Sequence, residues 1–179
     1  MNVFIDCGFT NGRATKKFFE KKQGNWLIYG FEPNREYHGQ TLDLGDRFRV
    51  VLIPAAVWSS DCIKTYYMNR SDHEKNNILG LHEGENEQEE MIVCLDLVEW
   101  MTRAIQQTDH VILKLDIEGA EFEVLEHLLD TGKMSIVKHL VIEWHERFFP
   151  CPDEKKEHRR KIEDLLATEF PNLQLSTWK

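Results

Sequence analysis

Short apolar runs alternate with amphipathic stretches along most of this sequence, and this alternation restricts the fold more than any other feature. Runs such as 3–5, 26–31 and 111–115 are rich in β-branched and aromatic residues and end in polar or glycine-containing turns. The stretches between them space their apolar residues three and four apart, as in the stripe 97–105, which is typical of helices with one buried face. The pattern predicts an α/β fold with a mostly parallel central sheet flanked by helices.

The alternation also predicts where the elements lie. We expect strands at 3–5, 26–31, 48–53, 63–68, 91–95, 111–116, 137–144 and 173–178, and helices at 12–22, 35–44, 97–105, 120–129 and 153–170. The run 48–53 is expected to be a buried strand and the run 63–68 an edge strand. Residues 71–90 are polar and rich in Asn, Glu and Gly, which predicts a mobile loop with the length of an active-site lid.

Length and charge restrict the classes of protein that this chain can represent. A chain of 179 residues suits a single domain, 1–179. Its 22 Lys and Arg against 31 Asp and Glu give a net charge of −9, which opposes binding to nucleic-acid phosphates and to anionic membranes. No signal peptide, membrane span, disulfide framework or zinc motif is recognised, so we expect a cytoplasmic protein with reduced thiols.

Polar residues at the carboxyl ends of the first two predicted strands indicate a nucleotide-type ligand. Gly8 and Gly12 allow a sharp turn after the first strand, and Glu32 follows 24 residues after Gly8. An acidic side chain there can accept hydrogen bonds from both ribose hydroxyls of an adenosine cofactor. Asp6 would repel a pyrophosphate but attract an ammonium group, so S-adenosylmethionine fits better than NAD. The alternative is that Asp6 and Glu32 only cap turns.

Four strings of the sequence resemble the FkbM-type methyltransferase family, whose members are S-adenosylmethionine-dependent O-methyltransferases that often act on sugars, glycans and polyketide hydroxyls. They are FIDCGFTNG at 4–12, GFEPN at 30–34, AAVW at 55–58 and, most specific, LKLDIEGAE at 113–121. The resemblance runs from about Val3 to His145 and implies a Rossmann-like class I methyltransferase fold. It implies that the cofactor-binding residues are Asp6, Gly8, Asn11, Gly12, Glu32, Pro33, Asn34, Ala56 and Val57, with the adenine near the last two.

The reacting end is predicted at the next two strand ends, where a base must lie near the transferred methyl group. Lys114, Asp116 and Glu118 follow one strand, and strand alternation would place Glu143 and His145 on the same side of the next. We expect Asp116 or His145 to act as the general base and Glu118 to orient the cofactor or the acceptor. A structural charge network is the alternative. A divalent metal on Asp116, Glu143 and His145 is chemically feasible but is not part of the prediction.

The acceptor is expected to be a small molecule or glycan whose ring packs on aromatic residues. The aromatic candidates are Trp58, Tyr66, Tyr67, Trp144, Phe148 and Phe149. Because the family resemblance implies more structure around the acceptor than this sequence supplies, a second copy of the chain, a partner or a fused domain is expected to complete that side. An NAD-dependent Rossmann oxidoreductase and a noncatalytic interaction module are the alternative functions.

Overall fold

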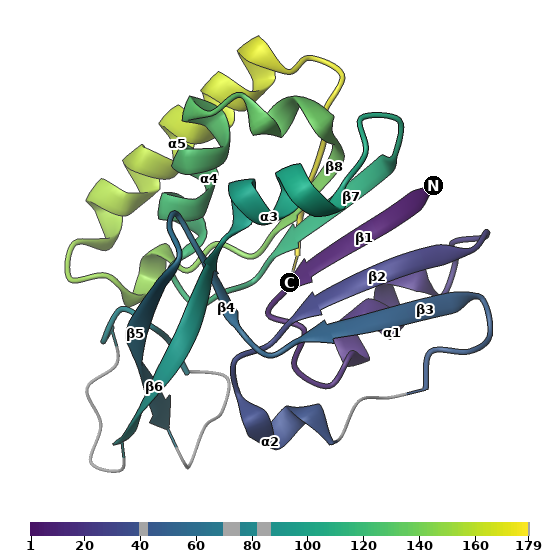
Figure 1. Cartoon of the computed structure of the whole chain (residues 1–179). Coiled ribbons are helices and arrows are strands. Elements are labelled where there is room, and N and C mark those ends of the chain that lie inside the picture. The colour runs from purple at the N-terminus through teal and green to yellow at the C-terminus, as the bar shows by residue number, and fades with distance from the viewer. Residues whose placement is uncertain (40–42, 70–75, 82–86, 179) are drawn as a thin grey trace.

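A six-stranded sheet forms the centre of the fold, and all of its strands run parallel (Figure 1). The computed structural model describes residues 1–39, 43–69, 76–81 and 87–178. The strand order of this large sheet is β3-β2-β1-β7-β8-β9. Its strands are β1 (Asn2–Cys7), β2 (Trp26–Phe31), β3 (Phe48–Ile53), β7 (His110–Leu115), β8 (Val137–Ile142) and β9 (Gln174–Thr177). The predicted parallel sheet is confirmed.

Helices cover both faces of the large sheet, but unequally (Figure 1). On one face lie α3 (Leu97–Ala104), α4 (Glu121–Asp130) and α5 (Pro152–Glu169), whose apolar residues share the main core with β1 and β7. The other face is covered by α1 (Arg13–Phe19), whose Phe19 ring packs against Phe4. The shorter helices are α2 (Arg35–His38), η2 (Lys133–Ile136) and η3 (Glu146–Phe148). This two-sided arrangement confirms the predicted α/β class.

Three of the helix boundaries follow signals that the sequence carries. Asp96 caps α3 by accepting a hydrogen bond from the Glu99 backbone N–H at 3.0 Å. After α4 ends at Asp130, the left-handed φ of Gly132 (68°) turns the chain into η2. Pro152 occupies the first turn of α5, where its missing N–H costs no hydrogen bond. Among the helices described, none is both long and apolar enough to cross a lipid bilayer.

A three-stranded second sheet stands beside the carboxyl end of β3 and corrects one sequence prediction. Its strands, in spatial order, are β4 (Ala56–Trp58), β6 (Glu87–Asp96) and β5 (Cys62–Asn69). Residues 87–90 were expected to belong to a loop, yet they form the first part of β6 and pair with β5. Gln88 and Glu89 point to solvent, so their polarity does not oppose an antiparallel strand. The rest of the proposed lid includes 71–75 and 82–86, which lie outside the described residues.

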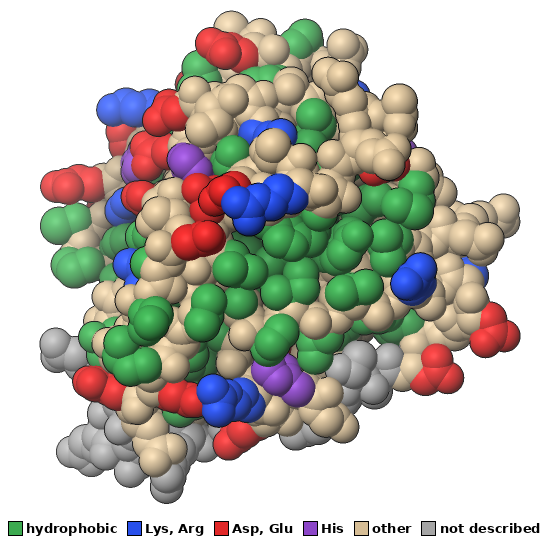
Figure 2. Space-filling view, in the orientation of Figure 1, with side chains coloured by type: hydrophobic (Ala, Val, Ile, Leu, Met, Phe, Trp, Pro, Cys, Tyr) green, Lys and Arg blue, Asp and Glu red, His purple; other side chains and the backbone are tan. Residues whose placement is uncertain are grey.

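The strand 48–53 was expected to be buried, and this expectation is wrong. β3 is an edge strand of the large sheet, and its residues alternate between partly buried and exposed positions. Val51 is 37% exposed, and apolar side chains are visible over this part of the sheet in Figure 2. The β-branched composition of residues 48–53 therefore predicted a strand correctly but did not predict its burial. An edge strand has a partner strand on one side only and is less covered than a central strand.

Candidate active site

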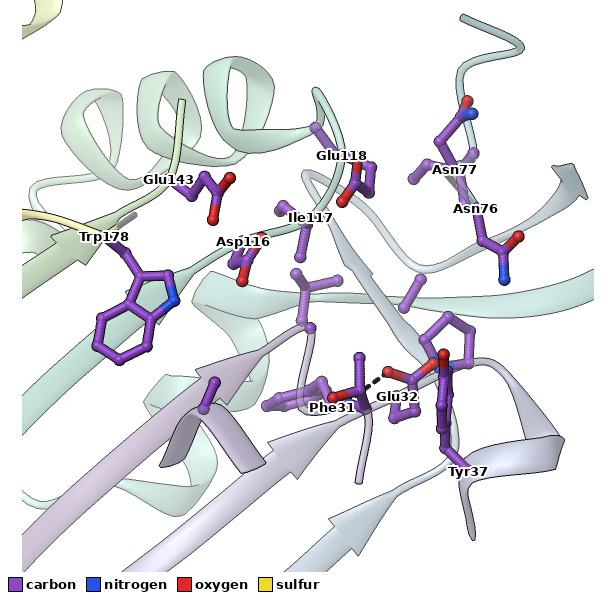
Figure 3. A pocket seen from close by; sticks show the side chains of 18 of the residues that line it. Phe31, Glu32, Tyr37, Asn76, Asn77, Asp116, Ile117, Glu118, Glu143 and Trp178 are labelled. Atoms are coloured by element: carbon purple, nitrogen blue, oxygen red, sulfur yellow. Dashed lines mark hydrogen bonds between the residues drawn. The ribbon is translucent and has the colours of Figure 1, made fainter. Parts of the chain in front are cut away.

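A cavity of about 560 Å³ opens where β1, β2 and β7 end side by side (Figure 3). Its walls come from the turn after β1, the residues that follow β2, the small sheet, and the turns after β7 and β8. Parallel strands that end together leave polar backbone and loop side chains around one crevice, which is where ligands bind in open α/β sheets. The predicted location of the site is therefore the location of the cavity.

Glu32 forms one end of the cavity and is held by backbone groups. Its Oε2 accepts a hydrogen bond from the Thr10 N–H and its Oε1 accepts one from the Asn34 N–H, each at 2.8 Å. Burial raises the pKa of Glu32 to about 7, and the two backbone hydrogen bonds only partly oppose that rise. Each carboxylate oxygen keeps a further lone pair for a ligand. The side chain is thus oriented before any ligand arrives.

The turn after β1 approaches the end of β7 closely, and glycine is required there. Gly8 has a φ of +87°, and a Cβ on it would lie 1.9 Å from the carbonyl oxygen of Asp116. Gly8 was expected to allow a sharp turn after the first strand, and the structure shows that this turn packs against the backbone of Asp116, the residue directly after β7. Gly8 and Asn11 line the cavity. Gly12 does not, because it packs against the Phe9 ring beneath the turn.

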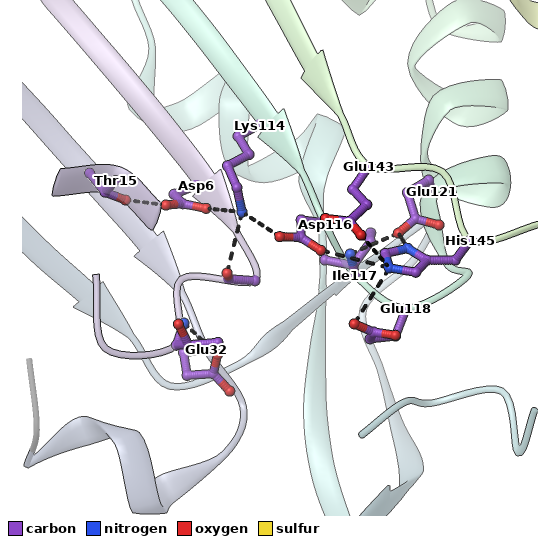
Figure 4. Close-up of polar contacts among 12 residues, drawn as sticks. Asp6, Thr15, Glu32, Lys114, Asp116, Ile117, Glu118, Glu121, Glu143 and His145 are labelled. Carbon is purple, nitrogen blue, oxygen red and sulfur yellow. Dashed lines mark hydrogen bonds and ion pairs between the residues drawn. The ribbon is translucent and has the colours of Figure 1, made fainter. Parts of the chain in front are cut away.

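Asp6 does not face the cavity, and the predicted contact with an ammonium group of the ligand is not supported. It lies opposite Lys114 on the neighbouring strand, and its Oδ1 is 3.0 Å from the Lys114 Nζ. Its Oδ2 accepts a hydrogen bond from the Thr15 hydroxyl of α1. Asp6, Thr15 and Lys114 are all buried between the large sheet and α1 (Figure 4). Asp6 does lie near the end of a strand, as predicted. The alternation of side chains along that strand, however, directs its carboxylate toward α1 and away from the cavity.

Lys114 connects the buried Asp6 to Asp116, which lines the cavity. Its Nζ also lies 3.0 Å from Asp116 Oδ2. Burial alone would lower the pKa of Lys114, but the carboxylates of Asp6 and Asp116 together raise it above its usual value. The predicted role of Lys114 as a reacting group is not supported by its position, because its fully buried ammonium is shared between two carboxylates and does not line the cavity.

The opposite end of the cavity is acidic. Asp116, Glu118 and Glu143, which we call the acidic wall, all line the cavity. Burial raises the pKa of Glu118 to about 8 and raises that of Glu143 as well. Oε2 of Glu118 is buried and has no hydrogen-bond partner in the described part of the chain. Glu118 also has a φ of +55°, an uncommon conformation for a residue other than glycine.

His145 lies behind the acidic wall and does not line the cavity. It is 1% exposed, and its Nδ1 is hydrogen bonded to Glu121 Oε1 at 2.7 Å. Glu121 itself accepts backbone hydrogen bonds from Ile117 and Gly119. Burial lowers the pKa of His145, but the hydrogen bond and charge of Glu121 and the nearby carboxylates raise it more. β8 ends at Ile142 and the chain then turns into η3, so strand alternation does not place Glu143 and His145, yet the turn brings His145 Nε2 to 3.7 Å from Glu143 Oε1.

The structure separates the sequence-predicted site residues into two groups. Those that line the cavity are Gly8, Asn11, Glu32, Pro33, Ala56, Val57, Asp116, Glu118 and Glu143. Those that support it from behind are Asp6, Gly12, Asn34, Lys114 and His145. Asn34, for example, is buried and caps α2 through its Oδ1. Of the proposed aromatic contacts, only Tyr66 reaches the cavity; Trp144, for example, packs on Phe122.

Several lining residues were not predicted from the sequence, and among them Tyr37, Asn76, Arg147 and Trp178 carry polar or aromatic side chains that bear on ligand binding. Asn76 is buried, and its Nδ2 has no hydrogen-bond partner among the described residues. It belongs to the polar stretch that was interpreted as a lid, and no local pattern distinguishes it from its neighbours there. Trp178 directly follows the last strand. The one signal that could have identified it is the tendency of ligands to bind beyond the carboxyl ends of parallel strands.

Comparison with known proteins identifies one family. A sequence model described as Methyltransferase FkbM domain matches residues 6–167 of the chain. No match was found among curated proteins or among solved structures. The matched range contains every residue of the acidic wall and Glu32, so both ends of the cavity belong to the family domain.

Proposed function

Because this chain belongs to the FkbM methyltransferase family and is a methyltransferase, we propose that it transfers the methyl group of S-adenosylmethionine to a hydroxyl oxygen of a sugar, a glycan or a related small molecule. One observation carries the proposal. A continuous cavity joins Glu32, which suits a ribose diol, to the acidic wall, which suits a cationic donor and a hydroxyl acceptor.

The nucleoside end of the cavity fits an adenosine. Glu32 offers the lone pairs of an oriented carboxylate to two hydroxyl groups. Ala56 and Val57 of β4 supply an apolar surface for a flat purine. The orphaned Nδ2 of Asn76 is a buried donor on the same cavity wall, and a buried donor of this kind is stabilised when a ligand supplies an acceptor. These residues would hold the nucleoside.

The acidic wall fits the chemistry at the other end. When bound, S-adenosylmethionine supplies an electrophilic methyl group on a positively charged sulfur. Asp116, Glu118 and Glu143 favour positive charge in this part of the cavity, because a cation beside them stabilises the ionised form of carboxyl groups whose pKa burial has raised. They also offer acceptors for the proton that leaves the acceptor hydroxyl. Lys114 fixes the Asp116 carboxylate through its ammonium group, so that residue is held in one orientation.

The composition of the same cavity supports the proposed acceptor. Tyr66 and Trp178 contribute aromatic side chains to its lining, which supports an acceptor with a ring that can pack on them. Arg147 lies on the same lining and 3.7 Å from Glu143, so it can donate to an acceptor oxygen while remaining close to the acidic wall. A sugar would meet both conditions, because its ring can pack on aromatic side chains and its hydroxyl oxygens can accept a hydrogen bond from Arg147.

The proposal is tested by two measurements on the full chain. Calorimetry with S-adenosylhomocysteine should give binding at one site, whereas NAD should give none at the same concentrations. Transfer of labelled methyl from S-adenosylmethionine to a panel of sugars and sugar-containing small molecules should then identify an acceptor. Binding of NAD in preference to S-adenosylhomocysteine, or the absence of binding to either methyl-donor compound, would contradict the proposal.

A further inference from the structure

We propose that Asp116 and Glu118 of the acidic wall, together with His145 directly behind it, bind one divalent metal cation. These three residues bring two carboxylate oxygens and one imidazole nitrogen to within 4.8 Å of one another. This set of three ligands was not predicted from the sequence, which left Asp116 and His145 as alternatives for the general base and gave Glu118 the role of orienting the cofactor or the acceptor. The tertiary structure instead directs all three side chains toward a common point (Figure 4).

The distances around His145 fit a shared ion better than direct hydrogen bonds. Its Nε2 lies 3.5 Å from Glu118 Oε1, 3.9 Å from Asp116 Oδ1 and 3.7 Å from Glu143 Oε1. Hydrogen bonds between such groups are shorter, at about 2.7–3.0 Å. Ligand atoms that each lie about 2.1 Å from one metal ion are about 3–4.2 Å apart. The observed spacing needs only small side-chain movements to match that range.

The orientation of His145 is a second, independent observation. The ring is 1% exposed, and its Nδ1 is hydrogen bonded to Glu121, which two backbone N–H groups hold in place. Nε2 makes no hydrogen bond to any residue that the structure describes. Metal-ligating histidines commonly donate one ring N–H to a carboxylate and bind the metal through the other nitrogen. His145 has this arrangement: Nδ1 is bonded to Glu121, and Nε2 faces the oxygens of Asp116 and Glu118.

The charges around this point are unbalanced. The carboxylates of the cluster are those of Asp6, Asp116, Glu118, Glu121 and Glu143, and its basic side chains are Lys114 and Arg147. Lys114 is taken up by Asp6 and Asp116, and Arg147 is 57% exposed. Among the described residues Glu118 forms an ion pair only with the His145 ring, and its Oε2 has no hydrogen bond there. A divalent cation would satisfy these oxygens and reduce the excess negative charge.

The donor set indicates the class of cation and its use. Two carboxylates and one imidazole suit a first-row divalent ion such as Mn²⁺ and also allow Mg²⁺. Such a site leaves coordination positions open toward the cavity, where an acceptor oxygen could bind and become more acidic. This use of the cation rests on the proposed function, whereas the binding of the cation does not.

Binding of Mn²⁺ alone tests the site. The metal-stripped full chain, without methyl donor, is titrated with Mn²⁺ by calorimetry and by the loss of the free-Mn²⁺ electron paramagnetic resonance signal. We expect one equivalent to bind, and we expect Glu118→Gln to weaken the affinity at least tenfold. Glu154→Gln, which changes an exposed carboxylate on α5, should leave the affinity within twofold of the original. Circular dichroism confirms that both variants are folded.

Two results would overturn the cation site: no stoichiometric Mn²⁺ binding by the original chain, or equal loss in Glu118→Gln and Glu154→Gln. Titration with S-adenosylhomocysteine in the presence of EDTA separates this test from that of the proposed function. Binding of S-adenosylhomocysteine without binding of Mn²⁺ withdraws the cation site alone. Binding of Mn²⁺ without binding of S-adenosylhomocysteine supports the cation site and contradicts the proposed function.

Discussion

The two ends of the cavity each contain a carboxylate that follows a parallel strand, but they are built in different ways. Glu32 follows β2 and is oriented by backbone N–H groups of Thr10 and Asn34. Asp116 follows β7 and is oriented by side chains, chiefly the buried Lys114. The Glu32 end therefore depends on the path of the backbone, whereas the acidic wall depends on a network of charges in which one change affects several groups.

This difference predicts which substitutions should lower stability most. Backbone donors cannot be removed by changing a neighbouring side chain, so the Glu32 end should keep its shape in most variants. The acidic wall contains carboxylates whose mutual repulsion is limited by few cations. Loss of a cation there leaves charges buried without a partner, which is among the most costly changes that a folded protein can undergo.

The largest effect is expected from Lys114→Met. Removal of the ammonium group leaves Asp6 and Asp116 without their shared partner, which should lower the free energy of unfolding by about 3–5 kcal/mol. Urea denaturation measures the change, and Lys138→Met, an exposed lysine on β8, is the control. The double variant Lys114→Met with Asp6→Asn should recover part of the loss. An equal effect of the two lysine variants would remove the distinction between the ends.

The next largest effect is expected from Glu32→Gln. A neutral amide should weaken the binding of S-adenosylhomocysteine about 10- to 100-fold, because hydrogen bonds to a charged acceptor contribute about 1.5–3 kcal/mol. The amide nitrogen of Gln cannot accept one of the two backbone hydrogen bonds that Glu32 receives from Thr10 and Asn34, so thermal unfolding is measured alongside to confirm that the variant is folded. Calorimetry measures the affinity, with Glu20→Gln, an exposed carboxylate at the end of α1, as the control. An unchanged affinity in Glu32→Gln would show that the diol does not bind at this end.

The pH dependence of donor binding should report the same carboxylate. Burial raises the pKa of Glu32 from 4.5 to about 7, with the charge of Asp6 acting in the same direction and the backbone hydrogen bonds of Asn34 and Thr10, together with Lys114, opposing it. Because the ionised form binds the ribose, affinity for S-adenosylhomocysteine should be highest above pH 7 and fall about tenfold between pH 8 and pH 6. Calorimetry across this range should give a flat profile for Glu32→Gln. An equally steep profile in that variant would assign the titration to another group.

The same shift has a defined effect on stability. A carboxyl group whose folded pKa is raised destabilises the fold once it must ionise, so its contribution is absent below pH 4.5 and complete above about pH 7. Between those values the unliganded protein should lose stability relative to Glu32→Gln as the pH rises. Thermal unfolding of the two proteins at pH 5 and pH 8 measures this difference, and a difference of opposite sign would contradict it.

The smallest effect is expected from Asn76→Ala. Removal of its unpaired Nδ2 donor should weaken the binding of S-adenosylhomocysteine about three- to tenfold, the contribution of one neutral hydrogen bond. The Asn69 N–H also loses its acceptor, so thermal unfolding must be measured alongside. Asn25→Ala, an exposed position, is the control. Unchanged affinity would restrict nucleoside binding to Glu32 and the apolar residues of β4.

Much of the fold could be predicted because its signals are local. The runs 26–31 and 111–115 lie within one residue of β2 and β7, since a buried parallel strand needs a short continuous apolar segment. Strand ends then placed Glu32 and Asp116 at one crevice. β6 was cut short because Glu87–Glu90 look like loop residues until a partner strand satisfies their backbone. The burial of β3 was predicted wrongly because the sequence of a strand does not show whether it has one neighbouring strand or two.

The amino-acid pattern by itself determined the α/β class, the order of most of its elements and the edge of the sheet at which the cavity opens, because periodicity and turn residues act over a few positions. The tertiary structure alone decided which carboxylates reach the cavity. Asp6 turned inward to Lys114, and His145 was placed behind Asp116 and Glu118. Those outcomes depend on contacts between residues more than a hundred positions apart or on the turn after a strand, where the local pattern no longer fixes the direction of a side chain.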